Sequence, residues 1–139
     1  MERAIEEARG GLAEGGIPIG AALERGGRLI AAGRNRRVQD GDPTAHAEID
    51  CLRSAGRVGS FRGTTLYSTL MPCLLCAGAI VQFGIPKVVA GESRTFPGAS
   101  EFLRSRGVEV VDLDLEECAD RMRDFIAKNP ALWNEDIGK

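Results

Sequence analysis

The stretch TTLYSTLMPCLLCAGAIVQFGIPKVVAG, residues 64–91, contains the pattern that decides the fold. β-Branched and aromatic residues are frequent in residues 64–69, which is typical of a strand, and Pro72 closes that strand. Residues 73–84 have the apolar spacing of a helix and end in glycine. Residues 86–91 are again short and apolar, as in a buried strand. The order strand, helix, strand indicates an α/β protein.

The segments on both sides continue this alternation. Before it, we expect a helix in residues 1–16 that ends at glycines, a hairpin in residues 19–35 around Arg25-Gly26-Gly27, and a helix in residues 45–54 that Thr44 is placed to cap. After it, we expect a loop with a short helix in residues 93–107, a strand in residues 108–113, and a helix in residues 115–130 that Pro130 stops. The whole pattern predicts an α/β fold, a three-layer α/β/α sandwich with a mixed sheet of about five strands.

Length and composition restrict the class of protein. The chain has 139 residues, the usual size of one domain, without a repeat or linker, so we expect a single domain over residues 1–139. Its formal net charge of −2 gives no field that would attract nucleic acid or an anionic membrane, and a small neutral partner fits better. The sequence has no apolar run of about 18 residues, and its first 16 residues carry acids, so we expect a cytoplasmic protein without a membrane span.

The chain has four cysteines, and two of them are close together. In a chain without a secretion signal, disulfides are not the expected use of cysteine. Cys73 and Cys76 therefore suggest a metal site or a redox pair. Cys51 and Cys118 lie on the apolar faces of predicted helices, and we expect both in the core.

Two short motifs combine into a candidate metal site. His46-Ala47-Glu48 and Pro72-Cys73-Leu74-Leu75-Cys76 each begin a predicted helix. Two cysteines three residues apart on a first helical turn share one face, and the helix N-terminus favours their thiolates. With a histidine from the neighbouring helix they form three nitrogen and sulfur ligands, which leave the fourth position of Zn²⁺ open to water. Glu48 is then placed beside that water as a proton carrier.

Each motif alone has a simpler interpretation. A lone C-x-x-C is also found in structural zinc half-sites and thioredoxin-like redox pairs, and a single histidine is most often an ordinary core or surface residue. Here His46 is the only histidine, and no second C-x-x-C is present to complete a closed structural site. Both motifs also lie at helix starts, which favours catalytic zinc.

The paired motifs H-x-E and P-C-x-x-C are the signature of zinc deaminases, and the resemblance extends over nearly the whole chain. EGGIPIG, residues 14–20, and WNEDIG, residues 133–138, narrow it to the fungal-type cytosine deaminases of the cytidine deaminase superfamily. Further similar segments are GRN, HAEID, residues 63–89, GESRTF and RGVEVV. The resemblance implies a cytidine deaminase-like fold and a homodimer.

The resemblance also implies a substrate pocket. Asn35 matches the asparagine that holds the polar edge of the pyrimidine ring, and Asp136 matches the carboxylate that accepts a hydrogen bond from the exocyclic amine. Phe96 and Trp133 match the aromatic walls, and Ile19 lies beneath them. Each also has a structural interpretation, as a turn residue, ordinary packing or a solvated carboxylate. A pocket for a flat polar ring needs stacking faces and a few placed polar groups, which favours the functional interpretation.

Three positions depart from the pattern of cytosine specialists. Ala47 stands where glycine is expected, Asp50 where a small hydroxyl residue is expected, and Leu74 where an acid is usual between the cysteines. Ala47 has the largest consequence, because its backbone N–H is expected to contact the base while its methyl group crowds or re-aims the ring.

The expected reaction is hydrolytic deamination. Zinc lowers the pKa of water, Glu48 takes the proton, the hydroxide attacks the ring carbon bearing the amine, and Glu48 returns protons so that ammonia leaves. Cytosine, converted to uracil, is the first choice. The alternative substrates are isocytosine, guanine, creatinine and a triazine.

Two further alternatives come from other classes. A tRNA adenosine deaminase is supported locally only by Arg34, Arg36 and Arg37, a cluster that is more often a solvated turn. A non-catalytic zinc module that binds a protein partner would have no use for Glu48, because a structural site needs neither an open position nor an acid beside it.

Overall fold

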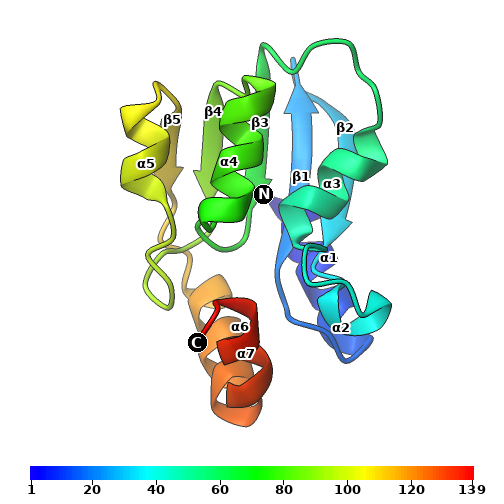
Figure 1. Cartoon of the computed structure of the whole chain (residues 1–139), viewed down its shortest axis with the longest axis vertical. Coiled ribbons are helices and arrows are strands. Elements are labelled where there is room, and N and C mark those ends of the chain that lie inside the picture. The colour runs from blue at the N-terminus through cyan, green and yellow to red at the C-terminus, as the bar shows by residue number, and fades with distance from the viewer.

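The computed structural model describes all 139 residues and contains one five-stranded mixed sheet in the order β2-β1-β3-β4-β5 (Figure 1). The strands are β1 (Gly20–Arg25), β2 (Arg28–Arg34), β3 (Thr64–Ser68), β4 (Lys87–Ala90) and β5 (Glu109–Asp112). β1 pairs with β2 and β3 antiparallel, while the β3–β4 and β4–β5 pairs are parallel. The mixed sheet predicted from the sequence is thereby confirmed.

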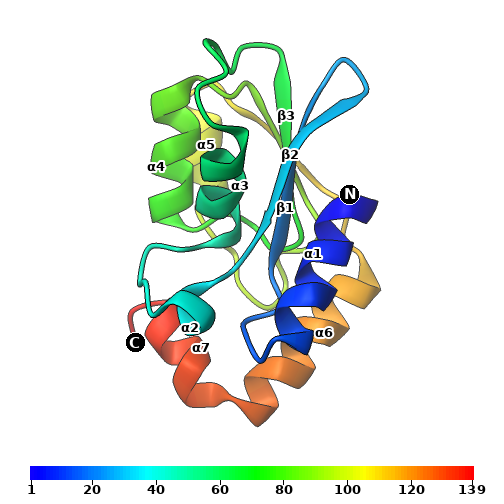
Figure 2. The same ribbon diagram turned by 90° about the vertical axis from the view of Figure 1, so that its right-hand side faces the viewer.

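Helices cover both faces of the sheet. They are α1 (Glu2–Ala13), α2 (Arg37–Asp40), α3 (Ala47–Ala55), α4 (Leu74–Phe83), α5 (Ser100–Ser105), α6 (Glu116–Lys128) and α7 (Pro130–Asp136). Figure 2 shows α3, α4 and α5 on one face and α1 and α6 on the other. The expected three-layer α/β/α arrangement is confirmed. No helix combines the length and apolar character needed to span a membrane.

The core lies on both faces of the central strands. Leu23, Leu66 and Val88, from β1, β3 and β4, are completely buried, as expected for strands packed between two layers of helices. Cys51 and Cys118 are also buried and form no disulfide, as their apolar surroundings in the sequence predicted. The packing of this core fixes the ends of the strands and helices that carry the polar residues.

The start of α3 differs from the prediction. The helix begins at Ala47 rather than Ala45, and Thr44 does not cap it. The backbone N–H and the hydroxyl of Thr44 both donate to Asp42 Oδ1, at 2.8 and 2.7 Å, so Thr44 belongs to a turn that precedes the helix. His46 occupies the N-cap position with extended backbone and makes no side-chain capping bond, which leaves its imidazole free for another role.

The carboxyl-terminal tail, residues 131–139, was assigned pocket residues but no helix from the sequence. Pro130 does follow the end of α6, but it is also the first residue of α7, a position where the fixed φ of proline suits a helix. A further short helix, α2, forms in residues that read as a turn. Both short helices lie at the end of the molecule toward which β3 and β4 run, as Figure 1 shows.

Candidate active site

Three ligand atoms converge at the amino-terminal ends of α3 and α4. His46 and Cys73 are the N-cap residues of these helices, and Cys76 lies in the first turn of α4. His46 Nδ1 is 3.4 Å from Cys73 Sγ and 3.7 Å from Cys76 Sγ, and all three ligand atoms lie within 4.8 Å of one another. A tetrahedral Zn²⁺ at ordinary Zn–S and Zn–N lengths needs N···S separations of about 3.6 Å. The residues present therefore fit zinc.

The surroundings of Cys73 favour its metal-binding form. A hydrogen bond from Cys76 lowers the pKa of Cys73 to about 4, against the opposing effect of burial, and His46 adds to the lowering. A thiolate is the form of cysteine that binds metals. The second ring nitrogen of His46, Nε2, lies 3.8 Å from Asp136 Oδ1, so a carboxylate stands behind the ligating imidazole.

Glu48 lies beside the ligands without belonging to the set. Its side chain is buried, its Oε1 accepts a 3.0 Å hydrogen bond from Ser68 Oγ, and its Oε2 accepts one of 3.3 Å from Cys76 Sγ. Burial raises the pKa of Glu48, and the negative charge of Cys73 raises it further. A carboxyl group with a raised pKa is suited to take up and return protons near neutral pH. Ser68 was not predicted from the sequence.

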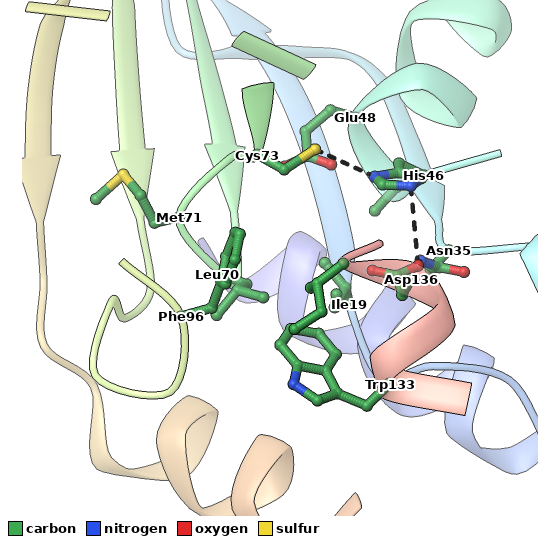
Figure 3. Close-up of a pocket in the computed structure, with 12 residues that line it drawn as sticks. Ile19, Asn35, His46, Glu48, Leu70, Met71, Cys73, Phe96, Trp133 and Asp136 are labelled. Carbon is green, nitrogen blue, oxygen red and sulfur yellow. Dashed lines mark hydrogen bonds and ion pairs between the residues drawn. The ribbon is translucent and has the colours of Figure 1, made fainter. Parts of the chain in front are cut away.

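A small cleft opens next to these groups (Figure 3). Its walls include every residue predicted for the site except Cys76, which is buried behind it. The predicted residues are Ile19, Asn35, His46, Ala47, Glu48, Cys73, Phe96, Trp133 and Asp136, and the residues that the sequence did not suggest are Leu70, Met71 and Ile137. Segments from both halves of the chain thus build one cavity.

Two aromatic rings close one side of the cleft. Phe96 comes from the loop after β4 and Trp133 from α7, and their ring centroids are 5.8 Å apart with planes at 87°. This edge-to-face arrangement is one that aromatic pairs favour. Trp133 is only 6% exposed, so α7 contributes to the core as well as to the cavity wall.

A polar cluster lies at another part of the cleft wall. Asp136 Oδ1 accepts hydrogen bonds from Asn35 Nδ2 at 3.2 Å and from Arg37 Nη1 at 3.1 Å. The amide oxygen of Asn35 accepts the backbone N–H of Arg37 at 3.1 Å, which fixes the orientation of the amide. Asp136 Oδ2 has no hydrogen-bond partner in the protein, so the carboxylate presents one free acceptor. Arg37 was read from the sequence as part of a turn.

Only one of the three unusual positions faces the cleft. Asp50 Oδ2 accepts the backbone N–H of Arg34 at 3.0 Å, which gives this carboxylate a structural role at the end of β2. Leu74 is 69% exposed and is not among the residues of the cleft wall. Ala47 is completely buried and does line the cleft. Any effect of these positions on the choice of substrate therefore centres on Ala47.

Comparison with known proteins places this site in a family. A family model described as the cytidine and deoxycytidylate deaminase zinc-binding region matches residues 1–92. The chain is 39% identical to the cytosine deaminase of Candida albicans, over 100% of this chain and 95% of that protein. It is 37% identical to the tRNA-specific adenosine deaminase of Haemophilus influenzae, over 92% of this chain and 82% of that one. A solved guanine deaminase structure from Nitrosomonas europaea superposes with a TM-score of 0.78 at 26% identity, covering 91% of this chain and 82% of that chain.

Proposed function

This chain belongs to the cytidine and deoxycytidylate deaminase family and is a zinc-dependent hydrolase, and on this basis we propose its substrate. The proposed reaction is the deamination of a free amino-heterocycle, with cytosine converted to uracil and ammonia. The observation that carries the proposal is the placement of Glu48 and the free oxygen of Asp136 in one cleft with the zinc ligands. Similarity to a cytosine deaminase over the whole chain supports cytosine as the base.

The metal ligands, Glu48 and Ser68 have different roles in the proposed reaction. Zinc held by His46, Cys73 and Cys76 supplies the polarisation that brings the pKa of water toward neutrality. Glu48 takes the proton that the water loses and delivers protons to the ring nitrogen and to the departing amine. Because Ser68 holds Oε1, the other oxygen of Glu48 remains directed toward the ligands. Water adds one oxygen to the ring carbon, and ammonia leaves.

The polar cluster accounts for recognition of an amine. A carboxylate can only accept hydrogen bonds, so the free Oδ2 of Asp136 suits an amino group that donates. We assign Asn35 to the polar edge of the ring, because its amide is fixed by neighbours on both sides. We assign Phe96 and Trp133 to the ring faces, with Ile19 beneath them.

The enclosed cleft favours a base without a sugar. Trp133 and Asp136 are nearly buried, and α7 brings both of them into the cleft wall, which restricts the room for a ribose or a nucleic acid backbone. A nucleotide inside a longer chain must leave room for its flanking backbone. We therefore expect cytosine to be a much better substrate than cytidine.

The arginines that favoured a tRNA substrate are engaged within the protein. Each pairs with at least one carboxylate: Arg34 with Glu7 and Glu14, Arg36 with Asp40, and Arg37 with Asp136. Arginines paired in this way offer little charge to phosphates. This observation argues against RNA binding by this cluster, although a tRNA-specific relative is known.

Guanine is the second candidate substrate. The observation in its favour is Ala47, whose methyl group lines the cleft at a position where cytosine specialists are expected to have glycine. The fold is also shared with a guanine deaminase. Isocytosine, creatinine and amino-triazines remain candidates for the same chemistry.

We also propose that the protein forms a homodimer through α4. This helix exposes Leu75 and Phe83 at 46% and 50% of their surface, and Leu74 at its start is exposed further. Apolar side chains gathered along one helix are typical of an interface. Sedimentation of the parent and of a Phe83→Lys variant tests this assignment, because a charge at an exposed apolar position of α4 should produce monomers.

The function is tested by ammonia release from zinc-loaded protein. The panel comprises cytosine, isocytosine, guanine, creatinine, an amino-triazine, cytidine, and a tRNA anticodon stem-loop containing adenosine. We expect cytosine to have the highest kcat/KM. A higher value for guanine would select the second candidate, and turnover of the stem-loop or of cytidine above that of every free base would overturn the proposal.

A further inference from the structure

All three nitrogen atoms of the Arg37 guanidinium group have a partner in the protein. Nη1 lies 3.1 Å from Asp136 Oδ1, and Nη2 lies 3.6 Å from Glu135 Oε1. Nε donates a 3.2 Å hydrogen bond to the carbonyl oxygen of Pro43. The side chain is only 9% exposed, so these contacts form largely away from water. A planar guanidinium can hold three partners in fixed directions, which an ammonium group cannot do.

These partners belong to three separate segments of the chain. Arg37 is the first residue of α2, Pro43 lies in the loop that leads to His46, and Glu135 and Asp136 end α7. Figure 2 shows α2 and α7 together at the end of the molecule that carries the cleft. The side chain of Arg37 therefore connects the loop that precedes His46 with α7, the helix that supplies Trp133 and Asp136 to the cleft wall.

The partners differ in how much they depend on Arg37. Glu135 is 69% exposed, and ion pairs at such positions contribute little. Asp136 is 5% exposed, and its only other hydrogen bond is from the neutral amide of Asn35. A buried carboxylate that loses its cation has to regain water, so α7 would have to move outward.

We infer that Arg37 is a positioning residue that holds α7 closed over the cleft and fixes Asp136 through Oδ1, so that Oδ2 remains free for the substrate. Arg37 does not line the cleft; it borders the adjoining outer hollow and reaches the cleft through Asp136. The kinetic part of this inference rests on the proposed function. The closure of α7 does not, because it concerns the protein without substrate.

The fluorescence of a tryptophan in α7 can report the position of this helix. The single tryptophan of the chain, Trp133, is buried in α7. In zinc-loaded protein, Arg37→Met should shift the tryptophan emission to longer wavelength and increase its quenching by acrylamide. Arg36→Met is the matched control, because Arg36 is more exposed and its side chain pairs only with Asp40. The control should emit and quench like the parent.

Kinetics with the best base give the second readout. We expect Arg37→Met to lower kcat/KM by about 10²-fold, the size of effect that a misplaced recognition group can have, with most of the loss in KM. Arg37→Lys should recover part of the lost kcat/KM, because lysine restores the positive charge but not the planar guanidinium geometry. Zinc content and circular dichroism establish that each variant is folded.

The outcomes separate the two proposals. Parent-like quenching and KM in a folded Arg37→Met variant would overturn the positioning role. If Arg37→Met fails to fold, a folded Arg37→Lys variant that matches the parent in both measurements overturns it equally. If the unmodified protein releases ammonia from no base, the proposed function fails, and the quenching comparison still decides whether Arg37 holds α7.

Discussion

Ser68 Oγ donates a 3.0 Å hydrogen bond to Oε1 of Glu48, and both side chains are buried. Ser68 is the last residue of β3, and Glu48 lies in the first turn of α3. The bond therefore ties the proton carrier to the sheet. Because one carboxylate oxygen is held in this way, rotation of Glu48 away from the ligands would cost a charge-assisted hydrogen bond.

This relationship predicts the effect of Ser68→Ala. Hydrogen bonds to charged groups contribute about 1.5 to 3 kcal/mol, so we expect kcat to fall by roughly 10- to 100-fold with zinc retained. The kcat of Glu48→Gln should fall further, by about 10²- to 10⁴-fold, because proton transfer itself is lost. The double variant should be no slower than Glu48→Gln alone. An additional loss in the double variant would show that Ser68 acts independently of Glu48.

Metal content tests the ligand assignment. His46→Ala, Cys73→Ser and Cys76→Ser should each bind far less zinc than the parent, which should hold close to one ion per chain. Cys118→Ala is the control, since Cys118 is buried but outside the cluster. It should retain its zinc. Full zinc content in all three ligand variants would refute the assignment.

The choice of base should respond to Ala47. Ala47→Gly removes a methyl group from the cleft wall, and one such group commonly changes discrimination by about tenfold or more. We expect the ratio of kcat/KM for cytosine over guanine to rise. Leu29→Ala, which alters an exposed position of β2 outside the cleft, should leave the ratio unchanged. Equal ratios in parent and Ala47→Gly would remove this residue from the specificity pocket.

The tail should be necessary for turnover but not for metal binding. A chain ending at Pro130 lacks Trp133 and Asp136 but retains every ligand, so it should hold zinc and lose most activity. Asp136→Asn tests the polar part alone, and it should reduce kcat/KM by an amount equivalent to about 2 to 3 kcal/mol. Parent rates in the truncated chain would mean that other residues recognise the base.

Two cysteines should be unreactive in the native protein. Burial raises the pKa of Cys51 to about 12 and that of Cys118 to about 11. Alkylation requires thiolate, which forms only as the pH approaches these raised pKa values, so neither thiol should react with iodoacetamide at pH 8. Both should react once denaturant opens the fold. Mass spectrometry of labelled peptides decides this, and rapid native labelling of Cys51 would contradict its burial.

The fold could be predicted because its signals are local. Strand and helix periodicity in residues 64–91 corresponds to β3, α4 and β4 in the structure. The metal cluster was predictable for the same reason, since His46 and Cys73 each stand at the start of a periodic segment. The start of α3 was placed two residues too early because Thr44 belongs to a turn with Asp42, and the N-cap position falls on His46 instead.

The residues that the sequence missed depend on distant partners. The partner of Arg37 is Asp136, ninety-nine positions away, and no local pattern connects them. Ser68 did have a signal: it shares the buried face of β3 with Thr64 and Leu66, and a polar residue there requires a partner. The role of Asp50 was also hidden, because its bond to the backbone of Arg34 is a tertiary contact.

The family model ends at residue 92, before Phe96, Trp133 and Asp136. The metal ligands and Glu48 precede that boundary, whereas the proposed substrate contacts are divided between Ile19, Asn35 and Ala47 before it and Phe96, Trp133 and Asp136 after it. In evolutionary terms, such an arrangement is modular: the carboxyl-terminal segment can diverge toward a new base while the part that activates water is inherited intact. A chimera that joins residues 1–92 to the corresponding segment of a guanine deaminase would use the same boundary in the laboratory.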